Sequence, residues 1–311
     1  MNFRLDASYQ LDANNSIGAN FGFLRNPKQT WNGDMSSSIL QDGDLSESSD
    51  SHADFFWQKN NLSSNIYYVG KIGKLSIDFN TDWLWSKEYQ NDVTKEQYQE
   101  VGMNAQSQTA HSLTNKDYHL LASKLVLSYP LLGGDLSLGG EYSNTHRTSK
   151  YQVVPTNLVS DDDSRITESM TSSFLTYSRD FGNLSLEAGM RYEYIDFNYY
   201  EYGKYVPGQS KSYGNWFPSL SLSMPVGKVQ MQLSYAVDIN RPSYHNLRSG
   251  IQYDNRYTYE TGNPFLVSQI SRNLNYELAY KWLTFDMTYS HTSNPIMSTV
   301  AVSYTHLRAH E

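Results

Sequence analysis

The stretch KVQMQLSYAVDI, residues 228–239, alternates between apolar and polar side chains along most of its length. Successive side chains of a β-strand point to opposite faces, so this pattern predicts a strand with one apolar and one polar face. The apolar face carries Val229, Met231, Leu233, Tyr235, Val237 and Ile239. Either a protein core or lipid can cover such a face, and the rest of the sequence must decide between them.

The composition is polar overall but rich in aromatic residues. Hydrophobic residues make up 39% of the 311 positions, the mean hydropathy is −0.61, and there are 26 Tyr, 12 Phe and 6 Trp. No apolar run reaches the ~18 residues of a transmembrane helix, which excludes a helical membrane protein. The net charge of −8, without a basic patch, argues against nucleic acid as a partner. The absence of Cys excludes disulfides and thiolate metal sites.

Strand candidates recur in pairs that are joined by short turns. The turns fall near residues 12–15, 71–74, 130–135, 181–183, 225–228 and 281–283, and all but the last carry Gly, Asn, Asp or Pro. Between the pairs we expect long loops over residues 26–58, 87–116, 149–168, 199–214 and 241–268. About twelve strands would therefore alternate between short and long connections. This asymmetry is typical of outer-membrane barrels.

Strand length and aromatic placement favour lipid as the cover of the apolar faces. A tilted membrane strand needs ~9–11 residues, whereas strands of soluble proteins are typically ~5–6 residues long. Aromatic residues collect towards the long-loop ends, as an interfacial girdle requires: Trp83, Trp85, Tyr192, Tyr194, Trp216, Phe217 and Tyr289. A large soluble β-sandwich or solenoid remains compatible with the alternation alone. We predict an all-β fold, a partial transmembrane antiparallel up-and-down β-barrel.

One segment also carries a family resemblance. A strand ends in Arg241–Pro242, an aromatic-rich loop leads to Gly262–Asn263–Pro264, and the next strand contains Glu277–Leu278. The segment resembles the outer-membrane β-barrel family related to TonB-dependent receptors. One interpretation is that these residues only shape the loop: Pro242 ends the strand, and Gly262 permits a positive φ. A direct ligand role is the alternative.

The resemblance implies an energy-coupled importer in the outer membrane of a Gram-negative cell. Relatives look like barrels of about 22 strands, filled by a plug and driven by a periplasmic TonB-type partner. We therefore expect residues 1–301 to be a fragment of such a barrel. Residues 302–311 look like a translated adapter tail, although a real basic strand is the alternative. The implied partners are outer-membrane lipid, the periplasmic energiser, a surface lipoprotein and an unidentified imported ligand.

Candidate site residues follow from the two environments of a barrel. The lumen candidates are the charged residues opposite the apolar strips, which either contact plug and substrate or solvate the wall: Asp78, Asp82, Glu187, Arg191, Glu193, Asp238, Glu277 and Asp286. The loop tyrosines either capture a ligand or pack the loops together: Tyr199, Tyr200, Tyr202, Tyr205, Tyr253, Tyr257 and Tyr259.

No catalytic motif is present, and we predict no enzyme, no cofactor and no metal site. Three adjacent carboxylates at Asp161–Asp163 favour a solvated loop over a Ca²⁺ site. His119 and His146 flank a hairpin and can face each other across it. A passive porin and an outer-membrane adhesin are the rival functions.

Overall fold

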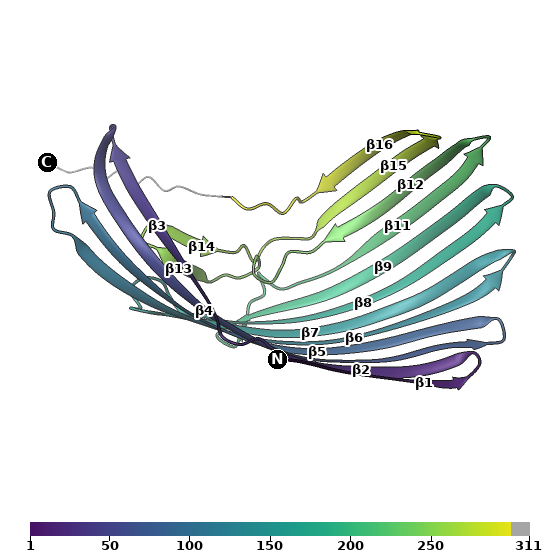
Figure 1. Ribbon diagram of the computed structural model, residues 1–311, viewed down its shortest axis with the longest axis horizontal. Helices are drawn as coiled ribbons and strands as arrows, with labels where there is room; N and C mark the ends of the chain where they lie inside the picture. Colours follow the sequence, from purple (N-terminus) through teal and green to yellow (C-terminus); the bar gives the residue numbers. More distant parts are fainter. Residues whose placement is uncertain (300–311) are drawn as a thin grey trace.

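The computed structural model describes residues 1–299, whose only regular structure is β-strand. A 14-stranded antiparallel sheet curves into an open trough, in the order β1-β2-β4-β5-β6-β7-β8-β9-β11-β12-β15-β16 (Figure 1). Two further members pair beside this path, β3 with β4 and β10 with β9, and β13 and β14 form a separate hairpin. The predicted all-β class and the twelve sequential strands are confirmed. The strands are β1 (Asn2–Asp12), β2 (Asn15–Arg25), β3 (Gln29–Gln41), β4 (Asp44–Ile72), β5 (Leu75–Glu100), β6 (Gln106–Leu131), β7 (Gly134–Val154), β8 (Asp162–Phe181), β9 (Leu184–Glu201), β10 (Lys204–Tyr205), β11 (Lys211–Val226), β12 (Val229–Asn240), β13 (Ile251–Asn255), β14 (Thr258–Thr261), β15 (Gln269–Tyr280) and β16 (Leu283–Ser293).

Tight turns join the predicted strand pairs at one end of the sheet (Figure 1). Gly73, Gly182 and Gly227 occupy three of them with φ of 61°, 64° and 65°, a region that glycine enters without steric cost. The β15–β16 turn carries no Gly, Asn, Asp or Pro. Lys281 takes φ 52° there, and Trp282 is 88% exposed. The prediction of short turns between these strands is confirmed.

The long polar connections form strands as well, so the prediction of loops at 26–58 and 87–116 is wrong. β4 has 29 residues and β5 has 26, and β3 pairs with the far half of β4. Backbone pairing needs no apolar side chains, and these mostly polar segments carry no apolar–polar alternation that would reveal a strand. The irregular connections here are short, such as 26–28, 101–105 and 155–161.

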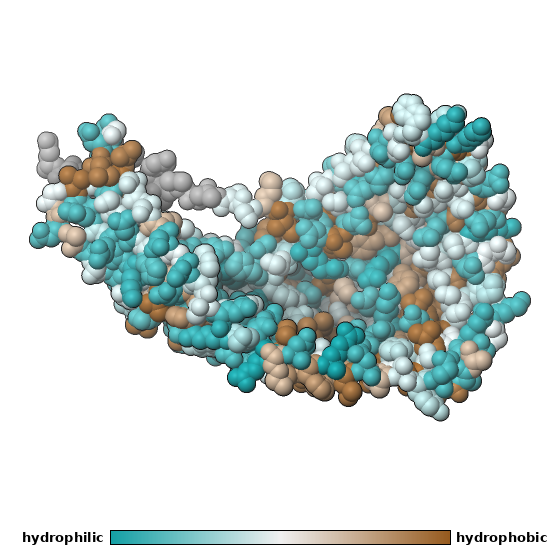
Figure 2. All heavy atoms as spheres, in the orientation of Figure 1, coloured by the Kyte–Doolittle hydropathy of each residue, from teal (hydrophilic) through white to brown (hydrophobic). Residues whose placement is uncertain are grey.

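We call the ~11 residues of each strand nearest a tight turn its barrel segment, because this length crosses a membrane. The parts of β3 to β9 and of β11 beyond the barrel segments are the distal ribbons. In Figure 2, hydrophobic side chains gather on the surface over β1 and β2 and towards the tight turns. Hydrophilic side chains predominate over the distal ribbons, apart from the β3–β4 tip, where Leu40 and Leu45 are exposed.

The strand register gives the barrel segments one apolar and one polar face. Leu222 lies opposite Leu233, Leu233 opposite Tyr276 and Tyr276 opposite Met287, which forms an apolar row across four strands. Leu233 remains 37% exposed and Met287 51% exposed, so no protein core covers this row. The next residue along β12, Gln232, lies opposite Glu277 on the other face. The predicted apolar register is confirmed.

Residues 241–268, which we call the inward segment, connect β12 to β15 across the concave face of the sheet (Figure 1). Leu247 in this segment packs with Ile166, Ile195, Phe197 and Tyr199, all buried. The register from β9 through β11 to β12 places Ile195 on the same face as Gln232, so the concave face is the polar face and also contains the main buried cluster. Phe217, expected in the outer girdle, is instead buried on this face opposite Arg191.

Candidate ligand pocket on the concave face

A cavity of about 520 Å³ lies between the β13–β14 hairpin and the distal ribbons of β3 to β7. We call it the distal pocket. Its size falls within the range of small-molecule sites, which hold ~300–1,000 Å³. The lining residues are Trp31, Gly33, Asp34, Met35, Ser51, Ala53, Phe55, Gln90, Asp92, Thr94, Ser112, Thr114, Lys116, Tyr151, His245, Gln252, Tyr253, Asp254, Thr258 and Glu260.

One wall of the distal pocket is aromatic. The rings of Trp31 and Phe55 lie 4.8 Å apart at an angle of 30°, and their residues are paired between β3 and β4. Trp31 remains 67% exposed, so most of its surface is free to contact a ligand. A flat apolar surface of this kind suits a planar group or the apolar face of a sugar.

Four carboxylates also line the distal pocket: Asp34, Asp92, Asp254 and Glu260. Asp34 Oδ1 lies 2.6 Å from His52 Nδ1. Asp92 accepts a hydrogen bond from Gln90 through Oδ2, and its Oδ1 atom is buried without a hydrogen-bond partner. Burial raises the pKa of Asp92 to about 6, and the negative charge of Asp254 acts in the same direction. Burial also raises the pKa of Asp254. The pocket therefore holds two neighbouring carboxyl groups that are costly to ionise together.

A buried hydrogen-bond network fixes the β13–β14 hairpin to the ribbons. Glu96, 3% exposed, accepts hydrogen bonds from Ser49 Oγ at 2.7 Å and from Tyr253 Oη at 2.9 Å. It also accepts from the backbone N–H of Arg256 at 3.2 Å, and Arg256 forms an ion pair with Glu47 at 2.8 Å. Hydrogen bonds to a buried charge are among the stronger ones, so this wall of the pocket is preorganised.

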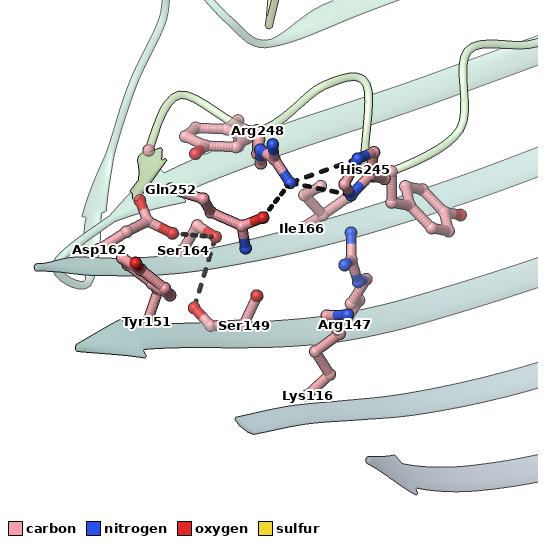
Figure 3. A pocket seen from close by; sticks show the side chains of 13 residues that line it. Lys116, Arg147, Ser149, Tyr151, Asp162, Ser164, Ile166, His245, Arg248 and Gln252 are labelled. Carbon is pink, nitrogen blue, oxygen red and sulfur yellow. Dashed lines mark hydrogen bonds between the residues drawn. The ribbon is translucent and has the colours of Figure 1, made fainter. Parts of the chain in front are cut away.

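A smaller hollow adjoins the distal pocket, and the two share Lys116, Tyr151, His245 and Gln252. Figure 3 shows Lys116 and Arg147 rising from the sheet towards His245, while Arg248 lies above them on the inward segment. Arg248 donates to Gln252 Oε1 at 2.7 Å and lies 2.9 Å from His245 Nδ1. We call this space the basic hollow. It brings cations from β6, β7 and the inward segment together.

The predicted lumen residues all lie on the concave face, but they form separate groups. Asp78 and Asp82 lie with Lys124 and Glu141 around one shallow depression, and Glu187 lies with Arg179 around another. Asp238 accepts from Asn273 at 2.8 Å, and Glu277 lies opposite Asp286.

Among the lumen residues, Glu193 is buried and contacts two arginines. Arg191 donates to it at 2.7 Å and Arg241 donates from the start of the inward segment. Arg191 also lies 3.4 Å from Glu141. The arginine of the family motif therefore connects the inward segment to the lumen wall, and its contacts are internal.

The other motif residues position the inward segment. An added Cβ on Gly262 would lie 2.6 Å from the backbone oxygen of Asn246 and 2.7 Å from that of Arg248. Asn263 donates its backbone N–H to Asn246 at 2.6 Å, and its side chain accepts from Phe265 at 3.0 Å. The prediction of a positive φ at Gly262 is wrong, since glycine is needed there for close backbone approach.

The predicted loop tyrosines do not converge on one site. Tyr199 is 1% exposed and lies 2.8 Å from Ser249 Oγ, while Tyr253 is 7% exposed within the Glu96 network. Tyr257 has a buried hydroxyl without a hydrogen bond, and Tyr200 packs edge-on against Tyr205. Tyr202, Tyr205 and Tyr259 are exposed. Of the seven, only Tyr253 lines the distal pocket and only Tyr199 lines the basic hollow.

Sequence reasoning missed the residues that make these cavities. Asp92, Lys116 and Arg147 lie in ribbons that were expected to be loops or strand ends. Arg248 and Asp254 lie in the inward segment, whose path cannot be deduced without the sheet. The available signal was the recurrence of arginine at 241, 248 and 256 in a segment that follows a strand.

Several other predicted features can be placed. His119 and His146 lie directly opposite each other in the β6–β7 register. Asp161 accepts from the backbone of Val153 and Asp163 pairs with Lys150, while Asp162 is buried. Within residues 1–299, no group of three or more His, Asp or Glu side chains is placed to hold a metal ion. The described part of the chain has no helix that could span a membrane.

A family model for the outer membrane protein beta-barrel family matches residues 70–306. The chain belongs to this family. It is therefore an outer-membrane β-barrel protein, and the apolar strips of its barrel segments face lipid. No curated protein matches the chain.

Solved structures with a similar arrangement are outer-membrane receptors. The alcaligin receptor FauA from Bordetella pertussis is 13% identical, with a TM-score of 0.41, over 99% of this chain and 54% of that one. The ferric-catecholate import receptor Fiu from E. coli K12 is 9% identical, with a TM-score of 0.46, over 97% and 58%. The ferric yersiniabactin uptake receptor FyuA from Yersinia pestis is 11% identical, with a TM-score of 0.40, over 94% and 52%. The chain thus spans about half the length of these structures.

Proposed function

We propose that this chain is the barrel part of a TonB-dependent type importer that captures its ligand in the distal pocket. The observation that carries the proposal is the position of the inward segment, which lies across the polar face and closes the pocket against the distal ribbons. A ligand held there borders the polar face of the barrel segments. Residues 1–301 then belong to a larger barrel, with further strands and a plug supplied by the intact protein.

Capture followed by driven passage suits this geometry better than free diffusion. The Glu96 network and the buried Leu247 cluster hold the inward segment firmly over the concave face. A firmly held segment obstructs a diffusion path, so passage requires rearrangement. We propose that a periplasmic TonB-type partner, acting through the plug, supplies the energy. A surface lipoprotein that delivers the ligand is a further proposed partner.

The test is depletion of solutes from the growth medium by cells that carry the intact protein. We expect solutes that the parent strain depletes to persist both when this gene is deleted and when the energising partner is deleted. If the protein is a passive porin, the solutes should persist only when this gene is deleted and not when the energising partner is deleted. An adhesin or scaffold predicts the same depletion in all three strains, and either of these results would contradict the proposal.

A further inference from the structure

The basic hollow contains more cationic groups than its own carboxylates neutralise directly. Lys116 pairs with Glu88 at 2.7 Å, and Arg248 Nη2 lies 3.3 Å from Glu260. Arg147 makes no ion pair with any described residue, and its guanidinium group lies 5.4 Å from the centre of the Tyr244 ring. Asp162 is the one carboxylate among the lining residues, and it accepts from Ser164 at the opposite end of the hollow (Figure 3).

Arg248 also has a buried donor there without an acceptor. The side chain of Arg248 is 11% exposed, its Nε atom is buried without a hydrogen bond, and its Nη2 atom makes only the 3.3 Å ion-pair contact with Glu260. Burial lowers the pKa of Arg147, nearby Tyr244 and Glu88 act against this shift, and the charge of Arg248 adds to it. Buried donors without acceptors are costly, and so is the proximity of like charges. Both costs fall if an anion lies between Arg147 and Arg248.

We propose that the basic hollow is an oxyanion subsite, in which Arg147 and Arg248 bind a carboxylate or phosphoryl group of a solute. The guanidinium group offers paired donors with the geometry that such groups require. The free space is about 20 Å³, which suits one small group rather than a whole ligand. The body of the ligand would then occupy the adjoining distal pocket against Trp31 and Phe55. This physiological role rests on the importer proposed above, whereas anion binding itself does not.

The position of the hollow excludes lipid as the source of the anion. Arg147 lies opposite Tyr118 and Ile166 in the register, and Ile166 belongs to the buried cluster beneath the inward segment. The hollow therefore opens on the concave side, away from the exposed apolar rows. A soluble anion is the remaining source.

The test uses the intact protein in outer-membrane vesicles and an arginine-selective dicarbonyl reagent. The modified fraction of each arginine is measured by mass spectrometry with no addition, with inorganic phosphate, with citrate and with glucose. We expect phosphate or citrate to slow modification of Arg147 and Arg248 several-fold, while glucose has no effect. The exposed Arg25 serves as the internal control. Protection by only one of the two anions assigns the subsite to that group.

A second measurement covers the case in which Arg147 resists the reagent. Calorimetric titration with phosphate and citrate compares the parent with Arg147→Gln and with Lys150→Gln, a matched loss of charge three positions along β7. Lys150 lies on the opposite face and pairs with Asp163. We expect at least about tenfold weaker binding for Arg147→Gln, equivalent to about 1.4 kcal/mol, and no change for Lys150→Gln. Unchanged anion affinity in Arg147→Gln overturns the subsite, whatever the uptake experiment shows.

Discussion

Single residues decide whether the inward segment can lie where it does. Gly262 sits against the backbone of the 246–248 turn, Arg241 donates to the buried Glu193, and Tyr253 donates to the buried Glu96. These contacts join residues far apart in the sequence. Their loss should release the segment without disturbing the barrel segments, which are held by strand pairing.

Gly262→Ala tests this dependence. The new methyl group would approach two backbone oxygens at 2.6 and 2.7 Å, so the turn must shift at a cost of about 1–3 kcal/mol. We expect faster hydrogen exchange across residues 241–268 of the intact protein and unchanged exchange in the barrel segments. Gly208→Ala is the matched control, since nothing lies within 4 Å of its added Cβ. Equal exchange in both variants would contradict the role given to Gly262.

Asp92 makes the distal pocket sensitive to pH. Its pKa is raised to about 6 by burial, so the folded protein retains the proton at a pH where the unfolded chain has lost it. The stabilisation is therefore present in acid and declines as the pH rises from about 4 through 6. We expect the protection of the β13–β14 hairpin amides, measured as their hydrogen-exchange rate relative to the intrinsic rate at the same pH, to be greater at pH 4.5 than at pH 7. Asp92→Asn should remove this difference, and an unchanged pH dependence in the variant would show that Asp92 is not its source.

At the scale of elements, each barrel strand separates two environments by a single residue step. Leu233 lies in the exposed apolar row of β12 and Gln232 lies on the concave polar face at nearly the same depth. A charged residue on the lipid face costs about 2–4 kcal/mol near the midplane, whereas the polar face tolerates it. For Leu233 and Gln232, the cost of a charged substitution is therefore set by the face on which the residue lies rather than by its depth.

Leu233→Lys and Gln232→Lys form a matched pair for this claim. We expect Leu233→Lys to lower the free energy of unfolding in lipid vesicles by about 2–4 kcal/mol and Gln232→Lys to change it little. Denaturant unfolding of the intact protein measures both. A larger loss for Gln232→Lys than for Leu233→Lys would mean that the two faces have been assigned the wrong way round.

The sequence was sufficient for the hairpins and the faces because both leave local signals. The two-residue period of β12 and the glycines at 73, 182 and 227 indicate strand and turn directly. The distal ribbons leave little, since β4 beyond the barrel segment is mostly polar and its three aromatic residues, at 55–57, are consecutive rather than alternating. The distal pocket and basic hollow combine Asp92, Arg147 and Arg248 from separate elements, so their proximity follows only from register and from the path of the inward segment.

At the scale of the molecule, the sheet formed by the described residues has two open edges. β1 pairs only with β2 and β16 only with β15. An unpaired backbone donor or acceptor in lipid costs several kcal/mol, so an open edge of ten or so residues cannot persist in a membrane. Residues 1–301 expressed alone should therefore aggregate, as measured by size-exclusion chromatography in detergent. A monodisperse monomer would contradict the proposal that they are part of a larger barrel.

We predict that the distal ribbons and both cavities lie outside the cell and that the tight turns face the periplasm, because outer-membrane barrels place short turns on the periplasmic side. Residues 1–311 contain no Cys, so each single substitution adds the only thiol in this part of the protein, and labelling is read relative to the unsubstituted protein. Asn104→Cys lies in the loop between β5 and β6, and Asn183→Cys lies in the tight turn between β8 and β9 at the other end of the sheet. We would treat intact cells carrying the full-length protein with a bulky, impermeant maleimide. We predict labelling of Asn104→Cys at once and of Asn183→Cys only after the outer membrane is permeabilised. The reverse order, or equal labelling at both sites, would contradict the account.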